Sequence, residues 1–148
     1  MRTFWEFCIL NEHEILQEIN NQMNDDGARP SCGGHSGISK PTEVKAIRNL
    51  TRVIRVVKIF GRVTIDWPWD VINAIRYVRE RVNLNKKLGG IYQARFVYKE
   101  EWQETCERFH ITQTTYNRRI WKIVNMCEKQ RKAIAQERKR MKNADKQY

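Results

Sequence analysis

From Thr112 to Met141 the chain contains no glycine and no proline, so nothing in this run breaks a helix. Apolar side chains return at helical intervals in the first half, and the second half is mostly polar and basic. The apolar positions are Ile120, Ile123, Val124, Cys127 and Ile134. The sequence therefore predicts one long basic helix here. With only seven Gly and three Pro in 148 residues, it predicts an all-α fold.

The residues that lead into this run and begin it, Glu100–Arg119, have the spacing of a helix-turn-helix. Cys106 would be the small residue that lets the two helices approach, and His110, four residues later, would occupy the bend. Such a bend needs a positive φ, which glycine adopts easily and histidine more readily than most other residues. Thr112 would cap the second helix, and Phe109 would close the core between the helices. A plain helical hairpin is the alternative interpretation.

The first turns of the second helix carry the side chains that we expect to contact bases. Asn and Gln amides bond bidentately to adenine, Arg bonds to guanine, and Thr offers a hydroxyl and a methyl group. The predicted base contacts are Thr112, Gln113, Thr114, Asn117 and Arg118. Other cations would contact phosphates, which position a protein without specifying sequence. These are Arg119, Lys122 and Lys129 here, and Lys45, Arg48, Arg52 and Arg55 in a helix predicted over Thr42–Phe60.

The charge of the chain indicates the kind of partner. A net charge of +11 and a pI near 9.8 are typical of a protein that binds a polyanion. Nucleic acid is the leading candidate, and an anionic membrane surface is the competing one. Two segments supply the excess: residues 40–62 have seven basic groups and one acidic group, and residues 110–148 have eleven and three. Residues 1–39 have two basic and six acidic groups and are not expected to meet the polyanion.

Composition and periodicity divide the chain into five parts. The parts are an acidic amphipathic helix (1–24), a Gly/Ser/Pro loop (25–41), a helical core with a basic helix (42–98), the helix-turn-helix unit (99–131) and a basic C-terminal tail (132–148). In the core, Asp70 is expected to cap a helix. The apolar face of that helix is Val71, Ile72, Ile75, Val78 and Val82. The tail is either a solvated end or an arm that binds phosphate or a second copy of the chain.

Two passages, SGISKPTEVKAIRNL and ARFVYKEEWQETCERFHITQTTYNRRIWKIV, resemble a known family. It comprises the late-gene transcription activators of phages and prophages of Gram-positive bacteria, of the RinA and ArpU type. The second passage is also similar to the promoter-reading helix-turn-helix of bacterial sigma factors, with Cys106 in place of the commoner Ala and His110 in place of the commoner Gly. The resemblance covers roughly residues 40–130. It implies sequence-specific binding to promoter DNA and activation of late genes through host RNA polymerase, in the cytoplasm of the bacterial host.

A small terminase subunit, which packages phage DNA, is the alternative function. Such proteins also combine a helix-turn-helix with helical oligomerisation, but they carry the helix-turn-helix near the N-terminus, whereas here it lies near the C-terminus. A second copy of the chain is a further candidate partner.

Metal, enzyme and membrane functions are weaker interpretations. Cys8, His13, Cys32 and His35 offer zinc-type ligands, but the Cys8–His13 spacing is not a common knuckle spacing, so no metal or other cofactor is expected. Paired catalytic carboxylates, a Gly-rich phosphate loop and an activated nucleophile are not evident, so we expect no enzyme. No stretch has the roughly 18 apolar residues of a membrane span, and the first residues lack the pattern of a signal peptide. We therefore expect a soluble protein with reduced cysteines.

Overall fold

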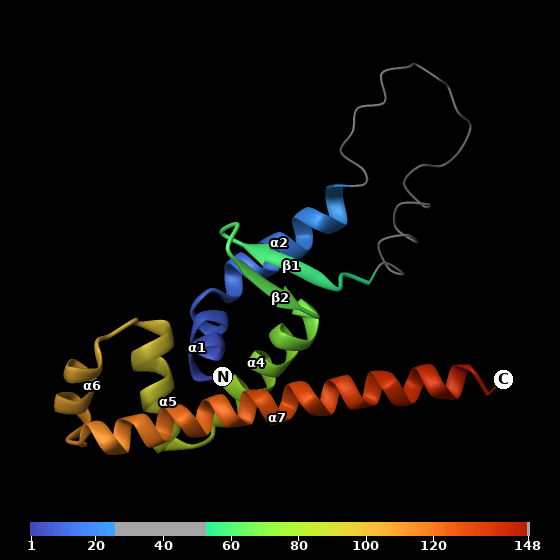
Figure 1. Ribbon diagram of the computed structural model, residues 1–148. Coiled ribbons are helices and arrows are strands. Elements are labelled where there is room, and N and C mark those ends of the chain that lie inside the picture. The colour runs from blue at the N-terminus through green and yellow to red at the C-terminus, as the bar shows by residue number, and fades with distance from the viewer. Residues whose placement is uncertain (26–52, 148) are drawn as a thin grey trace. The chain divides into compact units, whose positions relative to one another are not determined.

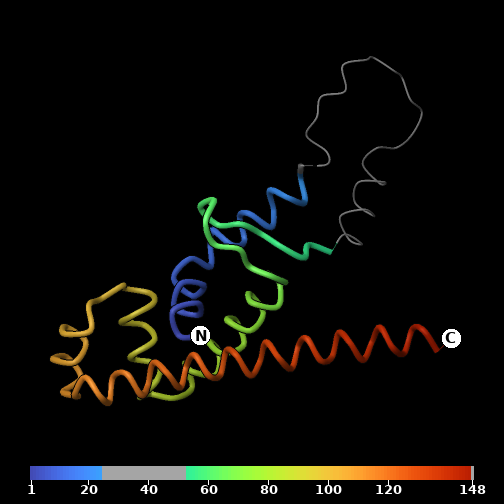
Figure 2. The backbone as a smooth tube through the Cα atoms, in the orientation of Figure 1, coloured from blue at the N-terminus to red at the C-terminus, as the bar shows by residue number. Residues whose placement is uncertain are grey.

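A computed structural model describes residues 1–25 and 53–147. The described chain is predominantly helical, as predicted, and also contains one two-stranded sheet (Figures 1 and 2). It divides into two compact units. The first consists of Met1–Glu12 and Trp69–Tyr148, and the second of His13–Pro68.

The first unit is built from helices around a long C-terminal one. They are α1 (Arg2–Leu10), α4 (Pro68–Asn83), α5 (Lys86–Tyr92), the π-helical turn η1 (Gln93–Val97), α6 (Trp102–Phe109) and α7 (Gln113–Asp145). Helix α7, orange to red in Figure 1, packs against α1, α5 and α6. Residues 91–97, within the helical core predicted over 42–98, supply the end of α5 and all of η1.

The apolar face predicted for the helix after Pro68 is confirmed in α4. All five of its predicted core residues, from Val71 to Val82, are fully buried. Burying one such side chain contributes about 1.5–3 kcal/mol, so this face is a major part of the core. The start of the helix differs from the prediction: α4 begins at Pro68, and Asp70 lies in its first turn. Proline suits that position because its missing N–H would have no partner there.

Core residues also come from α1 and α7. The buried side chains are Trp5, Cys8 and Ile9 of α1 and Tyr116, Ile120, Ile123, Val124 and Cys127 of α7. The Trp5 indole N–H donates to the Glu128 carboxylate at 2.7 Å, so the largest buried aromatic also has its polar atom satisfied.

The single N-terminal helix predicted over residues 1–24 is two helices, α1 and α2 (Glu12–Asp25). The chain leaves helical geometry at Asn11, with φ −118° and ψ 30°, and the Asn11 side chain donates to the Phe7 carbonyl at 2.9 Å. Asparagine competes well for backbone groups in this way, which explains the break.

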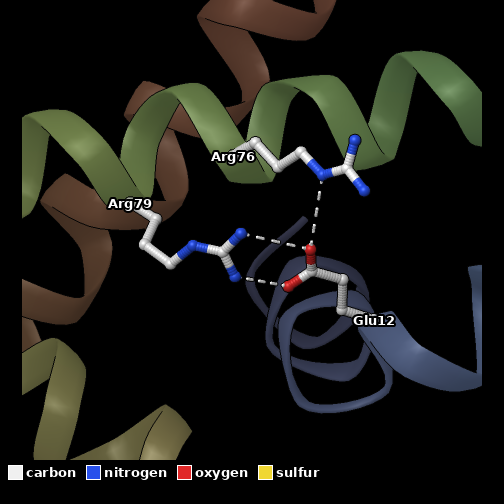
Figure 3. A network of polar contacts seen from close by, with 3 residues as sticks. All are labelled: Glu12, Arg76 and Arg79. Atoms are coloured by element: carbon white, nitrogen blue, oxygen red, sulfur yellow. Dashed lines mark hydrogen bonds and ion pairs between the residues drawn. The ribbon is translucent and has the colours of Figure 1, made fainter.

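Glu12, the first residue of α2, is held by two arginines of α4 (Figure 3). Arg79 donates to both carboxylate oxygens, at 2.8 and 3.4 Å, and Arg76 Nε lies 3.9 Å from the carboxylate. This fork geometry is the stronger form of an ion pair, because two parallel hydrogen bonds fix the orientation of both groups. The contact therefore ties the chain just after α1 to α4.

The second unit corrects the end of the helix predicted over Thr42–Phe60: residues 53–60 are not helical, and residues 42–52 lie outside the described residues. Its described end is an antiparallel hairpin of β1 (Val56–Ile59) and β2 (Val63–Asp66), paired with Val57 opposite Ile65. Alternate side chains point inward, so the period is two and not helical. The Gln22 side chain of α2 donates to the Val56 carbonyl at 3.1 Å. The buried side chains of this unit include Ile15, Ile19, Ile54, Val57, Ile59 and Ile65.

The loop predicted over residues 25–41 lies almost wholly outside the described residues, as do Lys45, Arg48 and Arg52. Among the helices of residues 1–25 and 53–147, none is long and apolar enough to cross a membrane.

Candidate nucleic-acid interface

A three-residue turn joins α6 to α7, and His110 begins it. His110 has φ 53° and ψ 46°, the left-handed geometry that the sequence predicted for the bend. Its N–H donates to the Glu107 carbonyl, and the Ile111 N–H donates to the Cys106 carbonyl at 3.1 Å. These two bonds form a Schellman motif, which satisfies carbonyls left open at a helix end. The turn is therefore fixed by the backbone itself.

Thr112 begins the second helix in the predicted way. Its hydroxyl oxygen accepts the Thr115 N–H at 3.2 Å and lies 3.1 Å from the Thr115 hydroxyl. The Thr112 backbone is extended, with φ −81° and ψ 161°, as an N-cap residue should be. Because α6 ends at His110 and α7 is capped at Thr112, the chain changes direction within three residues.

The packing of α6 differs in part from the prediction. Tyr116 of α7 is buried, but the fully buried side chain of α6 is Thr105, and Cys106 is only half-buried. The Thr105 hydroxyl donates to the Glu101 carbonyl at 3.2 Å, which satisfies it inside the fold. Prediction from spacing alone missed this residue because a threonine that bonds its own helix can be buried like an apolar residue.

Phe109 does not close a core between α6 and α7, and 37% of it is exposed. Its ring lies against Gly90 of α5, so closely that a Cβ on Gly90 would be 2.9 Å from two ring carbons. Arg108 stacks on the same ring at 5.0 Å. Phe109 therefore fixes the end of α6 to α5, at the point where the turn into α7 begins.

The five predicted base-contact residues do not share one side of α7. Thr112, Gln113, Thr114 and Arg118 are exposed, and Asn117 is half-buried. Gln113 and Asn117, four residues apart, line a shallow depression with Arg2, Arg95 and Trp102. Arg118 lines a different depression farther along the helix. Successive helical residues turn by about 100°, so Arg118 projects from a side adjoining that of Asn117.

The outer side of α7, opposite its buried residues, forms a continuous basic surface. One depression on it is lined by Arg118, Trp121, Lys122, Asn125, Met126 and Lys129. A neighbouring one joins α5 to α7 through Lys87, Arg118, Arg119 and Lys122. Three predicted phosphate contacts, Arg119, Lys122 and Lys129, thus lie on or beside one surface. The sequence prediction did not include Lys87, or Trp121, which is 41% exposed.

The inner side of α7 is anchored far beyond its last buried residue. Arg131 lies over the rings of Phe4 and Trp5, at 5.3 and 5.9 Å, and Arg138 forms an ion pair with Asp70 of α4. The helix continues to Asp145 without a break. Helix α7 is therefore one element, as the unbroken run from Thr112 to Met141 predicts, and it is held to the core as far as Arg138.

Arg55, predicted as a phosphate contact on a helix, precedes β1 instead. It is exposed, and its guanidinium lies 5.8 Å from the centre of the Trp67 ring. Its carbonyl accepts the Trp67 N–H at 2.7 Å, which closes the base of the hairpin.

The thiols of α1 and α7 are structural. Cys8 and Cys127 are buried, unpaired in any disulfide, and burial raises the pKa of each thiol to about 12. A thiol kept protonated in this way is a poor metal ligand and a poor nucleophile. In residues 1–25 and 53–147, no three His, Cys, Asp or Glu side chains gather as metal ligands would. Cys32 and His35 of the proposed zinc set lie outside those residues.

Comparison with known proteins found no matching family model, no matching curated protein and no matching solved structure.

Proposed function

We propose that the protein binds duplex DNA in a sequence-specific way, through a helix-turn-helix made of α6 and α7 with the first turns of α7 in the major groove. One observation carries this proposal. The left-handed residue His110 and the capping residue Thr112 set the start of α7 at a sharp turn, and an exposed basic surface begins one helical turn later at Arg118.

The major groove of B-DNA is about 12 Å wide and admits one α-helix. Arg118 is assigned to a guanine, because it projects away from the buried side of α7 and its guanidinium can bond bidentately. Gln113 and Asn117 are assigned to adenines, on the adjoining side of the helix.

Lysines and arginines around this site are assigned to phosphates. Lys87 of α5 and Arg119 and Lys122 of α7 surround one depression, which gives three cations from two elements. Lys129 lies two turns farther along α7. Because α7 has 33 residues, it is about 50 Å long, and a straight helix of that length leaves the curved groove after a few turns. Lys129 is therefore expected to meet backbone and not bases.

From the resemblance to late-gene activators of the RinA and ArpU type, we further propose that the DNA is a promoter and that the bound protein activates phage late genes with host RNA polymerase. This part depends on the two passages that carry the resemblance, and the geometry supports only the DNA-binding part.

Selection from a randomised duplex library with the full chain tests the DNA-binding proposal. We expect one enriched motif, and Arg118→Ala should relax preference at one position by about 1–3 kcal/mol. Lys129→Ala is the matched control: it should weaken binding to all sequences alike and lower the salt slope by about one. An unenriched library would contradict sequence-specific binding.

The regulatory part needs a separate experiment. With the selected site placed upstream of a reporter, the purified protein should protect that site and raise transcription by the host polymerase. A large ring that protects no promoter would instead support the small terminase subunit.

A further inference from the structure

The hairpin of the second unit ends in an unusual turn. The Arg62 N–H donates to the Ile59 carbonyl at 3.1 Å, and both residues between them, Phe60 and Gly61, have positive φ, at 53° and 65°. Two positive φ values are the mark of a type I′ turn, for which Asn-Gly is the preferred pair because asparagine tolerates this region. Phenylalanine does not tolerate it well, since its bulky side chain crowds the backbone there.

Phe60 is not a core residue, because 64% of it is exposed. The two strands behind the turn are held together by a buried side-chain pair and a backbone hydrogen bond. Val57 and Ile65 are buried opposite one another, and the bond from Trp67 to Arg55 closes the base. The paired strands thus present an exposed aromatic ring at their tip, on a residue with a strained backbone. Strain that a fold retains at one exposed residue is an indication of function at that residue.

The tip is also cationic. Arg55, Lys58 and Arg62 are exposed, and Lys58 and Arg62 flank Phe60 at two residues on each side. Arg55, Lys58 and Arg62 belong to residues 40–62, one of the two segments that supply the excess positive charge of the chain. The other segment, residues 110–148, contains α7. A flat apolar ring can stack on planar bases, and the two cations beside it can contact the phosphates on either side. Duplex DNA offers both groups, and proteins that kink DNA insert apolar side chains between base steps.

We propose that the hairpin tip is a second DNA contact, in which Phe60 wedges between adjacent base pairs and kinks the duplex while Lys58 and Arg62 hold the flanking phosphates. The inference rests on the proposed function in one respect, that the ligand is duplex DNA. It does not depend on which sequence α7 reads. Base steps differ in how easily they open. A wedge at the hairpin tip would therefore favour DNA sequences that kink easily, which is a second source of specificity.

The decisive variant is Phe60→Asn in the full chain, because stability and function should move in opposite directions. Asparagine suits the turn, so the melting temperature should stay level or rise. Affinity for a labelled duplex of about 30 base pairs should fall roughly tenfold, as expected on losing one stacking contact, and the bend measured by energy transfer between the duplex ends should decrease. Phe60→Trp should keep both binding and bend.

One control matches this variant, and a second variant tests the flanking cations. Met141→Gln removes a similarly exposed apolar side chain, 61% accessible, from the far end of α7 and should change neither affinity nor bend. Lys58→Ala should lower the salt slope by about one and leave the melting temperature unchanged.

Arg118→Ala separates the failure of this inference from failure of the proposed function. If Arg118→Ala weakens binding while Phe60→Asn leaves affinity and bend unchanged, the tip does not contact DNA and only this inference is overturned. If the wild-type chain binds no duplex, both are overturned. Binding to vesicles of phosphatidylserine and phosphatidylcholine that Phe60→Asn abolishes, with DNA binding intact, would identify the tip as a membrane contact and overturn the wedge.

Discussion

Arg138 of α7 forms an ion pair with Asp70 of α4, across a sequence separation of 68 residues. The Asp70 side chain is only 10% exposed and that of Arg138 is 24% exposed, so water screens the pair less than it screens a surface pair. The contact holds the distal half of α7 to the core at a point where the helix has no fully buried residue.

Asp70→Ala should therefore destabilise the protein by about 2 kcal/mol, because it leaves a partly buried guanidinium without its carboxylate. The effect should concentrate in the last turns of α7, with faster amide exchange after Arg138, measured by hydrogen exchange and urea unfolding. Arg140→Ala is the matched control, since its side chain is 79% exposed and its pair with Glu137 is a surface pair. Equal effects of the two substitutions would contradict an anchoring role for Asp70.

His110→Gly should stabilise the protein by about 1 kcal/mol. His110 occupies the left-handed region, where glycine has no Cβ to crowd the backbone. The same substitution at Glu107, in the middle of α6, should instead cost about 1 kcal/mol. Thermal unfolding of the two variants checks both signs, and a lower melting temperature for His110→Gly would show that the imidazole itself stabilises the turn.

Thr112 has two assigned roles, capping α7 and contacting DNA, and substitutions can separate them. Thr112→Ala should cost about 1 kcal/mol, because the Thr115 N–H loses its acceptor. Thr112→Ser retains the acceptor and should preserve stability. If Thr112→Ser also loses base preference in the DNA selection, the methyl group makes the base contact. If it binds as wild type does, the methyl group makes no base contact.

The raised thiol pKa values predict how stability depends on pH. Folding raises the pKa of Cys8 and Cys127 from 9.0 to about 12, so the native state favours the protonated thiols. Their contribution is fully present below pH 9 and is lost as pH rises toward 12, at about 1.4 kcal/mol per pH unit for each thiol. Urea unfolding across this range should therefore show falling stability. At neutral pH, peptide-resolved alkylation of the native protein should label Cys106 well before Cys8 or Cys127.

Local features of the fold could be predicted from the sequence where the cause is local. The apolar face of α4, the positive φ of His110 and the cap at Thr112 each depend on residues within a few positions, and each is confirmed. The hairpin was missed because Val57, Ile59 and Ile65 suit either period, and because Phe-Gly does not signal a type I′ turn as Asn-Gly does. Gly61, the residue directly after the helix predicted over Thr42–Phe60, completes that turn.

The sequence prediction selected residues of the candidate site by chemical type, and it did not consider in which direction each side chain projects from α7. Rotation by 100° per residue already implies that Asn117 and Arg118 face adjoining directions, so this division could have been predicted from sequence. The exposure of Trp121 could not, because tryptophan is usually part of a core. Lys87 and Phe109 depend on the packing of α5 against α6 and α7, which joins residues distant in sequence.

The contact between Phe109 and Gly90 has a consequence for genetics. Alanine at Gly90 would place a methyl group 2.9 Å from two carbons of the Phe109 ring, so the ring at the end of α6 would have to shift. The turn at His110 follows the end of α6, so a shift there would also change the direction in which α7 leaves the turn. If the proposed DNA binding holds, a screen for loss of binding should therefore recover Gly90 alongside Arg118, although Gly90 itself is not a proposed DNA contact.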